Sequence, residues 1–117
     1  MISEKKFVDK LQKYYENDEQ ADVGREVYQD DTQWFVDLVV KKPEATFYIE
    51  CENTEESIRA GMGQALGYSA GELYGIPMVV VPKGEASSAD TARLRASDAV
   101  IIREFDHEEG KYIDERE

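Results

Sequence analysis

The sequence predicts a single α/β domain with a mixed central sheet and helices on both of its faces, giving three layers. The chain has 117 residues, 41% of them hydrophobic, which is enough for one core but not for two. Three strand-like segments follow one another without a helix between them, which favours antiparallel hairpins. Helical segments precede each of the last two strand-like segments, which favours parallel crossovers. The expected order of elements is therefore αβββαβαβ.

The first element is a helix over about 3–16. Ser3 is a suitable N-cap, because its side chain can accept a hydrogen bond from the first helical turn. Phe7, Leu11 and Tyr14 recur at helical spacing and form one apolar face.

Three strands are expected next, over about 23–29, 32–41 and 45–52. The last two are rich in β-branched and aromatic residues, which favour strands. The segments between them, 30–31 and 42–44, have the composition of turns.

A second helix is expected over about 53–74. Asn53 and Glu56 form a capping box at its start, and Gly75 is suited to end it. The run 76–81 is entirely apolar, which is typical of a strand buried on both faces.

A short helix over about 88–96 and a last strand over about 99–105 complete the predicted fold. The remaining segment is charged, and we expect it to be frayed or loosely docked. The predicted division is a domain over 1–106 and an acidic tail over 107–117.

The charge of the chain is strongly negative, with 26 acidic and 14 basic residues and a formal net charge of −12. Such a field repels polyanions and argues against tight nucleic-acid binding through a broad basic face. Two interpretations remain open. The protein does not touch nucleic acid, or it works in a high-salt cytoplasm where repulsion is screened. The second is favoured.

Two residue types that each occur only once argue against several classes of site. Cys51 is the only cysteine and His107 the only histidine, so we expect no internal disulfide, no cysteine-based zinc site and no histidine-centred mechanism. No apolar run approaches the ~18 residues of a membrane span, so we expect a soluble protein in the cytoplasm without a membrane partner.

Two acidic residues interrupt the second and third strands. A hairpin centred near residues 43–44 pairs residues whose numbers sum to about 87, which places Asp37 opposite Glu50 with Cβ atoms ~5 Å apart. Such carboxylates repel each other unless a cation lies between them. Oxygen ligands of this kind are those that Mg²⁺ prefers.

Further acids share this face in the predicted sheet. Glu52 alternates with Glu50, while Cys51 points into the core. If residues 30–31 form a two-residue turn, Glu26 lies opposite Phe35 and diagonal to Asp37. The competing interpretation is a solvated acidic sheet face in an acidic protein.

On the helix that follows, Gln64 and Tyr68 are four residues apart and share one face. Taken alone, this pair is more typical of ordinary packing than of a site.

Together, these features resemble the PD-(D/E)XK nuclease superfamily, and most closely its RecB-type and archaeal Holliday-junction-resolvase-like branches. The shared features are the order αβββαβ, an aspartate in strand two, Glu-x-(charged) in strand three and Gln-x-x-x-Tyr on the next helix. The resemblance covers about 3–105 and implies a restriction-endonuclease-like fold. Asp37 matches the motif aspartate, and Glu50 matches the acid of (D/E)xK.

The resemblance also assigns roles to other residues. Glu26 matches the additional upstream acid of many members. Gln64 and Tyr68 match the pair that orients the site and contacts the nucleic-acid strand in that branch.

The motif departs from the family at one position, because Glu52 occupies the place of the lysine. Some members with Glu-x-Glu are active, whereas others that lack the lysine are inactive modules. The cations that could substitute for the lysine are Lys41, Arg59 and Lys83, and the sequence does not choose among them. Arg59 and Lys83 are also expected to bind substrate.

The resemblance implies a metal-dependent deoxyribonuclease of the endonuclease or junction-resolvase type. One or two Mg²⁺ or Mn²⁺ ions would be held by Asp37, Glu50 and the Cys51 carbonyl, with Glu26 as an outer ligand. Glu52 would act as general base or as a second metal ligand. DNA is the expected partner, and a homodimer is expected because cutting two strands generally needs two sites.

Two other hypotheses remain open. The chain could be a catalytically inactive nuclease-fold module for dimerisation or protein binding, which the missing lysine and the net charge favour. It could also be an unrelated acidic α/β domain whose aligned acids are coincidental. Asp37 and Glu50 on opposite sheet faces would support that last hypothesis.

Overall fold

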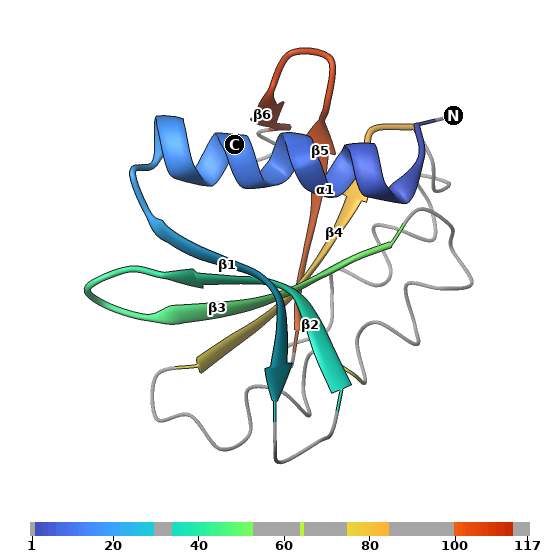
Figure 1. Ribbon diagram of the computed structural model, residues 1–117. Helices are drawn as coiled ribbons and strands as arrows, with labels where there is room; N and C mark the ends of the chain where they lie inside the picture. The colour runs from blue at the N-terminus through green and yellow to red at the C-terminus, as the bar shows by residue number, and fades with distance from the viewer. Residues whose placement is uncertain (1, 30–33, 53–63, 65–74, 85–99, 114–117) are drawn as a thin grey trace.

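The computed structural model describes residues 2–29, 34–52, 64, 75–84 and 100–113. Over these ranges one long helix crosses a face of a twisted six-stranded sheet (Figure 1). The elements are α1 (Glu4–Lys13), the single π-helical turn η1 (Tyr14–Asp18), β1 (Asp22–Gln29), β2 (Trp34–Lys41), β3 (Thr46–Cys51), β4 (Gly75–Pro82), β5 (Ile101–Asp106) and β6 (Lys111–Tyr112). None of the helices described is long and apolar enough to cross a membrane.

The strands lie side by side in the order β1-β2-β3-β4-β5-β6. β1, β2 and β3 are antiparallel, β3, β4 and β5 are parallel, and β5 and β6 are antiparallel. The predicted α/β class and mixed sheet are therefore confirmed. The helices predicted over 53–74 and 88–96 lie outside the described residues, except for Gln64, which is helical.

The helix α1 forms because its two ends and one face are suited to it. The Ser3 hydroxyl accepts a hydrogen bond from the Lys6 backbone N–H at 3.2 Å, as expected of an N-cap. Phe7 and Leu11 are buried against the sheet. The turn η1 then widens the helix and buries Tyr15, which is 4% exposed, more deeply than Tyr14.

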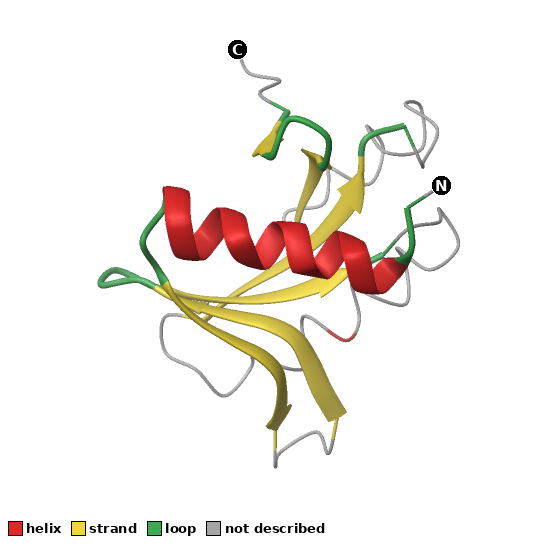
Figure 2. Ribbon diagram, turned by 45° about the horizontal axis from the view of Figure 1, so that its top comes forward, coloured by secondary structure: helices red, strands yellow, loops and turns green. Residues whose placement is uncertain are grey.

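The main core lies between α1 and the sheet (Figure 2). It is built from inward-facing side chains of the helix and of strands β2 to β6, namely Phe7, Val8, Leu11, Tyr15, Leu38, Val40, Ile49, Cys51, Met78, Val80, Phe105 and Tyr112. Val79 and Val81, on the opposite face of β4, are also buried. Because β4 is buried on both faces, it has the uninterrupted apolar sequence that predicted it.

The sequence predicted a frayed or loosely docked tail after β5, and the described part of it, up to residue 113, is instead an ordered turn and a short strand. Asp106 accepts hydrogen bonds from the backbone N–H groups of Glu108 and Glu109, at 3.1 and 3.0 Å, and so forms a tight turn. The chain then returns as β6, where Tyr112 is buried and its hydroxyl lies 2.6 Å from that of Tyr15. The docked strand arises because Tyr112 adds apolar area to the core, which charge composition alone does not reveal.

The pairing of β1 with β2 also differs from the prediction. Phe35 pairs with Tyr28 rather than with Glu26, so the register is displaced by two residues from that of a two-residue turn. The last pair of this ladder joins Gln29 to Trp34, and residues 30–33 between them lie outside the described residues. A displacement of two keeps every side chain on its predicted face and brings Glu26 level with Asp37.

Candidate metal centre

The candidate site lies where β2 and β3 separate. Their ladder pairs Leu38 with Ile49 and Lys41 with Thr46, which is the predicted register with a sum of 87. The ladder ends at Leu38 and Ile49, and β1 and β2 bend away together from β3 (Figure 2). Asp37 and Glu50 are the next residues on the two strands, so they stand at the point of divergence.

At this point carboxylate side chains accept hydrogen bonds from main-chain N–H groups that the ladder no longer pairs. The Asp37 carboxylate accepts a hydrogen bond from the Cys51 backbone N–H at 2.9 Å. The Glu50 carboxylate lies 3.4 Å from the Asp37 backbone N–H, which donates to it. Each acid thus satisfies a main-chain donor of the opposite strand, and both carboxylates are held in fixed positions.

Three acids form one cluster here, which we call the acid cluster: Asp37, Glu50 and Glu52. One carboxylate oxygen from each lies within 4.8 Å of the others. Glu50 is only 5% exposed, while Asp37 and Glu52 are half-buried. The structure therefore brings together Asp37, Glu50 and Glu52, the three acids that the sequence placed on one face of these strands.

The surroundings of Asp37 disfavour its negative charge. Burial raises the pKa of its carboxyl group above the usual value, and the charges of Glu4 and Glu26 add to the rise. The hydrogen bond from Cys51 and the charge of Arg25 act in the opposite direction without cancelling it. A bound cation would relieve this excess of negative charge.

A pocket of about 270 Å³ opens beside Asp37. Its lining comes from the first turns of α1 and from β1 and β2, namely Glu4, Lys5, Val8, Arg25, Glu26 and Asp37. Glu26 adopts φ 51°, the left-handed region, at the position level with Asp37. This backbone bend brings Glu26 to the pocket wall, so the predicted neighbourhood of Glu26 and Asp37 is present although the predicted pairing was wrong.

The Cys51 carbonyl points toward the same gap. The Glu52 N–H donates to the Val80 carbonyl on β4 at 3.0 Å. Because a trans peptide directs its C=O opposite to its N–H, the Cys51 carbonyl points away from β4, toward β2. Three carboxylates and this carbonyl are hard oxygen donors, the set that suits Mg²⁺ or Mn²⁺.

Two of the cations that the sequence offered in place of the lysine, Lys41 and Lys83, make other contacts or lie at a distance from Asp37. Lys41 is four residues along β2 from Asp37, roughly 13 Å in an extended strand. The ammonium group of Lys83, which follows β4, lies 3.5 Å from the Asp106 carboxylate at the end of β5. The structure instead places Lys5 and Arg25 on the pocket wall.

The other predicted residues are only partly described. Gln64 is helical and half-buried, and Arg59 and Tyr68 lie outside the described residues. Glu4, Lys5 and Arg25 were missed, because the path of α1 over the sheet brings them in. Glu4 carried a local signal, an acid in the first helical turn, but that signal is equally expected from the helix dipole.

Comparisons with protein-family models, with curated proteins and with solved structures found no significant match to this chain.

Proposed function

We propose that this chain is a metal-dependent deoxyribonuclease that hydrolyses phosphodiester bonds, of the endonuclease or junction-resolvase type. The observation that carries the proposal is the acid cluster, in which three carboxylates meet within 4.8 Å at the divergence of two strands. The resemblance of Asp37…Glu50-x-Glu52 to the PD-(D/E)XK motif supports a nuclease over other metal-dependent hydrolases. The restriction-endonuclease-like topology belongs to the same proposal.

In this proposal Asp37, Glu50 and the Cys51 carbonyl hold one or two Mg²⁺ or Mn²⁺ ions, with Glu26 as an outer ligand. The bound ion would supply positive charge that offsets the acid cluster, polarises the phosphodiester and favours deprotonation of an attacking water. Glu52 is half-buried at the end of β3 and takes the position of the family lysine. Its carboxylate would accept the proton of the water.

Gln64 would help to orient the scissile strand, and Arg59, Tyr68 and Lys83 would contact DNA. A homodimer would place two such sites for cutting both strands of a duplex or junction. Because the net charge of −12 opposes binding to a polyanion, activity is expected to improve at multimolar salt, the reverse of the usual dependence.

A catalytically inactive nuclease-fold module is the second candidate. One observation favours it: Asp37 and Glu50 already satisfy backbone donors, so they have a structural use without any metal. In that case the acids fasten the divergence of β2 and β3, and the chain serves dimerisation or protein binding.

Cleavage of branched, single-stranded and duplex DNA with Mg²⁺ or Mn²⁺, at low and at multimolar KCl, tests the proposal. We expect metal-dependent cleavage that Asp37→Asn abolishes and that Glu44→Gln, which removes one charge at the exposed hairpin turn, leaves unchanged. No cleavage in any condition, or equal cleavage by Asp37→Asn, would refute the nuclease.

The role of Glu52 needs its own pair of variants. If Glu52 is the base, Glu52→Gln lowers the rate at least ~100-fold, within the range of general-base effects. Glu52→Lys restores the family motif. An inactive wild type that gains metal-dependent cleavage from Glu52→Lys would identify the site as a relic and support the second candidate.

A further inference from the structure

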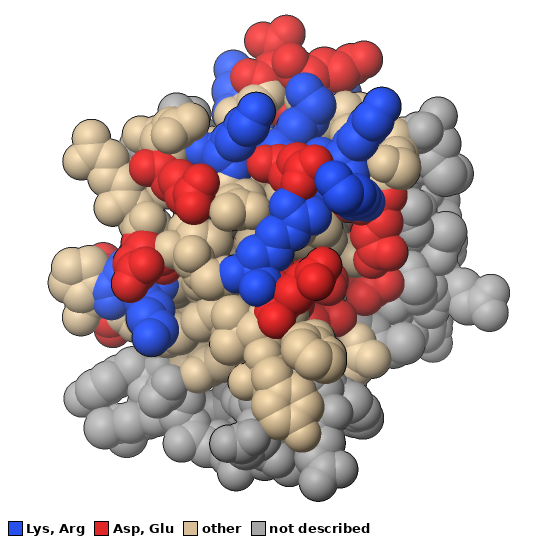
Figure 3. All heavy atoms as spheres, in the orientation of Figure 1, with Lys and Arg blue, Asp and Glu red and all other residues tan. Residues whose placement is uncertain are grey.

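A stripe of lysines runs along α1 on the side away from the acid cluster. Lys6, Lys10 and Lys13 are spaced by four and three residues and therefore project from one side of the helix. Lys and Arg side chains gather on the face of the molecule that α1 crosses, among scattered carboxylates (Figure 3).

These three lysines are not neutralised within the described part of the protein. No ion pair to another described residue is formed by Lys6, Lys10 or Lys13, whereas Lys5 pairs with Asp9 and Lys42 with Glu19. Like charges at this spacing destabilise a helix, and Lys6 stands in the half of the helix where the dipole disfavours a cation. Lys41 and Lys111 likewise form no ion pair to a described residue, so the stripe is distinguished by the alignment of three such lysines on one side of α1.

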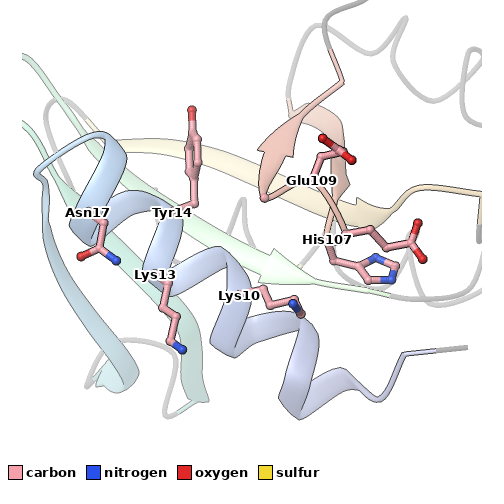
Figure 4. A pocket seen from close by; sticks show the side chains of 8 residues that line it. Lys10, Lys13, Tyr14, Asn17, His107 and Glu109 are labelled. Atoms are coloured by element: carbon pink, nitrogen blue, oxygen red, sulfur yellow. The ribbon is translucent and has the colours of Figure 1, made fainter.

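The stripe forms one wall of two adjoining pockets of about 310 and 470 Å³. Lys10, His107 and Glu108 line both of them. Figure 4 shows Lys10 extending from α1 toward His107, which comes from the turn between β5 and β6. The pockets share no lining residue with the pocket at the acid cluster.

His107 contributes a polar atom that lacks a partner. Its Nδ1 is buried and makes no hydrogen bond to any residue that the structure describes, and its ring packs edge-on against Phe7 with centroids 6.3 Å apart. Because His107 lines both pockets, its imidazole can offer an N–H there to an anionic oxygen.

We propose that this site, the lysine pocket (Lys6, Lys10, Lys13 and His107), binds a phosphoryl group. Each of the two pockets offers two ammonium groups, Lys10 with either Lys6 or Lys13, together with the imidazole of His107, and these match the oxygens and the negative charge of a phosphate. The net charge of −12 does not prevent this, because the Debye length of about 8 Å at physiological salt lets nearby lysines dominate the local field. Glu108 and Glu109 stand on the opposite wall and weaken the site.

The proposal goes beyond the proposed nuclease and needs neither its metal nor its activity. The phosphoryl group can come from free phosphate or a mononucleotide, or from the backbone of a nucleic-acid strand. The two sources make different predictions for the same variants, and all binding is measured in EDTA so that the acid cluster holds no metal.

Inorganic phosphate is titrated into the full chain while the imidazole NMR signal is followed. His107 is the only histidine, so the signal is unambiguous. We expect a saturable shift, at least fivefold weaker binding in Lys10→Gln, and tighter binding in Glu108→Gln. The matched control, Lys41→Gln, removes the same charge from an exposed position of β2 and should change the affinity less than twofold.

The absence of a saturable shift up to 50 mM phosphate, or equal weakening by Lys10→Gln and Lys41→Gln, would overturn the proposal. A second titration uses a fluorescent thymidine octamer. If Lys10→Gln weakens its binding and lowers the salt slope by about 0.7, the pocket holds a backbone phosphate. If only phosphate binding weakens, the ligand is a free phosphate or nucleotide. DNA cleavage in a separate assay reports on the nuclease and does not enter either result.

Discussion

Two clusters of side chains beneath α1 differ in the interactions that their polar atoms make. In the tyrosine cluster (Tyr14, Tyr15, Phe105 and Tyr112) the rings pack edge to face, and two hydroxyls satisfy each other at 2.6 Å. Burial raises the pKa of Tyr15 to about 12, so the pair stays neutral. In the acid cluster, by contrast, like charges crowd together. The first cluster stabilises the fold, whereas in the second, burial and neighbouring acids disfavour the negative charge of Asp37.

The largest expected effect follows from breaking the tyrosine cluster. Tyr112→Ala removes a ring that is 8% exposed and leaves the Tyr15 hydroxyl unpaired, so we expect a loss of ~3–5 kcal/mol in the free energy of unfolding. Urea denaturation followed by circular dichroism measures it. The control, Tyr28→Ala, removes a ring that is 49% exposed and should cost far less. Equal losses would show that β6 contributes little to the core.

The next largest effect comes from neutralising the acid cluster. At neutral pH in EDTA, Asp37→Asn should be more stable than the wild type, because it removes a charge that burial and neighbouring acids disfavour. With Mn²⁺ at ~100 times its dissociation constant, the wild type should gain about 2.7 kcal/mol and the variant nothing. Thermal denaturation with and without the metal measures both. A wild type that Mn²⁺ does not stabilise would leave the acids with a purely structural use.

The same carboxyl group predicts a pH dependence. A carboxyl whose pKa is raised by folding stabilises the native state while it is protonated, and this stability is lost as pH rises from about 3.9 through the raised folded pKa. The pKa values of Asp9 and Asp106 are lowered, so the stability that these two residues contribute rises with pH instead. The informative quantity is therefore the stability of the wild type minus that of Asp37→Asn, which should fall across this window. A flat difference would contradict the raised pKa.

The smallest expected effect on stability comes from the backbone conformation of Glu26. Glu26→Gln removes only the charge, whereas Glu26→Gly also relieves the left-handed conformation at φ 51°. We expect the glycine variant to be more stable than the glutamine variant by roughly 0.5–1 kcal/mol, the left-handed penalty less the entropy of glycine. Chemical denaturation of both variants in EDTA measures the difference. A more stable glutamine variant would show that the strand can straighten at this residue.

The predictable parts of the fold are those that depend on the residue pattern within a short segment of the sequence. Alternation and a short turn fixed the register that joins Leu38 to Ile49, and an apolar run identified β4. The register of β1 was wrong because the length of its turn cannot be read from two aspartates. The strand β6 was missed because Tyr112 is a single apolar contact in a charged segment.

The acid cluster was predictable from hairpin register alone, since pairing beside the turn places Asp37 next to Glu50. The pocket wall that Glu4 and Arg25 form beside Asp37 was not predictable. Glu4 and Arg25 reach Asp37 only because α1 and β1 pack where they do, and that packing depends on contacts far apart in sequence. The divergence of β2 from β3 was also not visible in the sequence, because strand propensity continues through it.

That divergence has a consequence for motion. Beyond Leu38 and Ile49 the two strands are joined by the carboxylates of Asp37 and Glu50 rather than by a continuing ladder. The Cys51 amide is therefore protected by a side chain, and its hydrogen exchange reports opening of the gap rather than unfolding of the sheet.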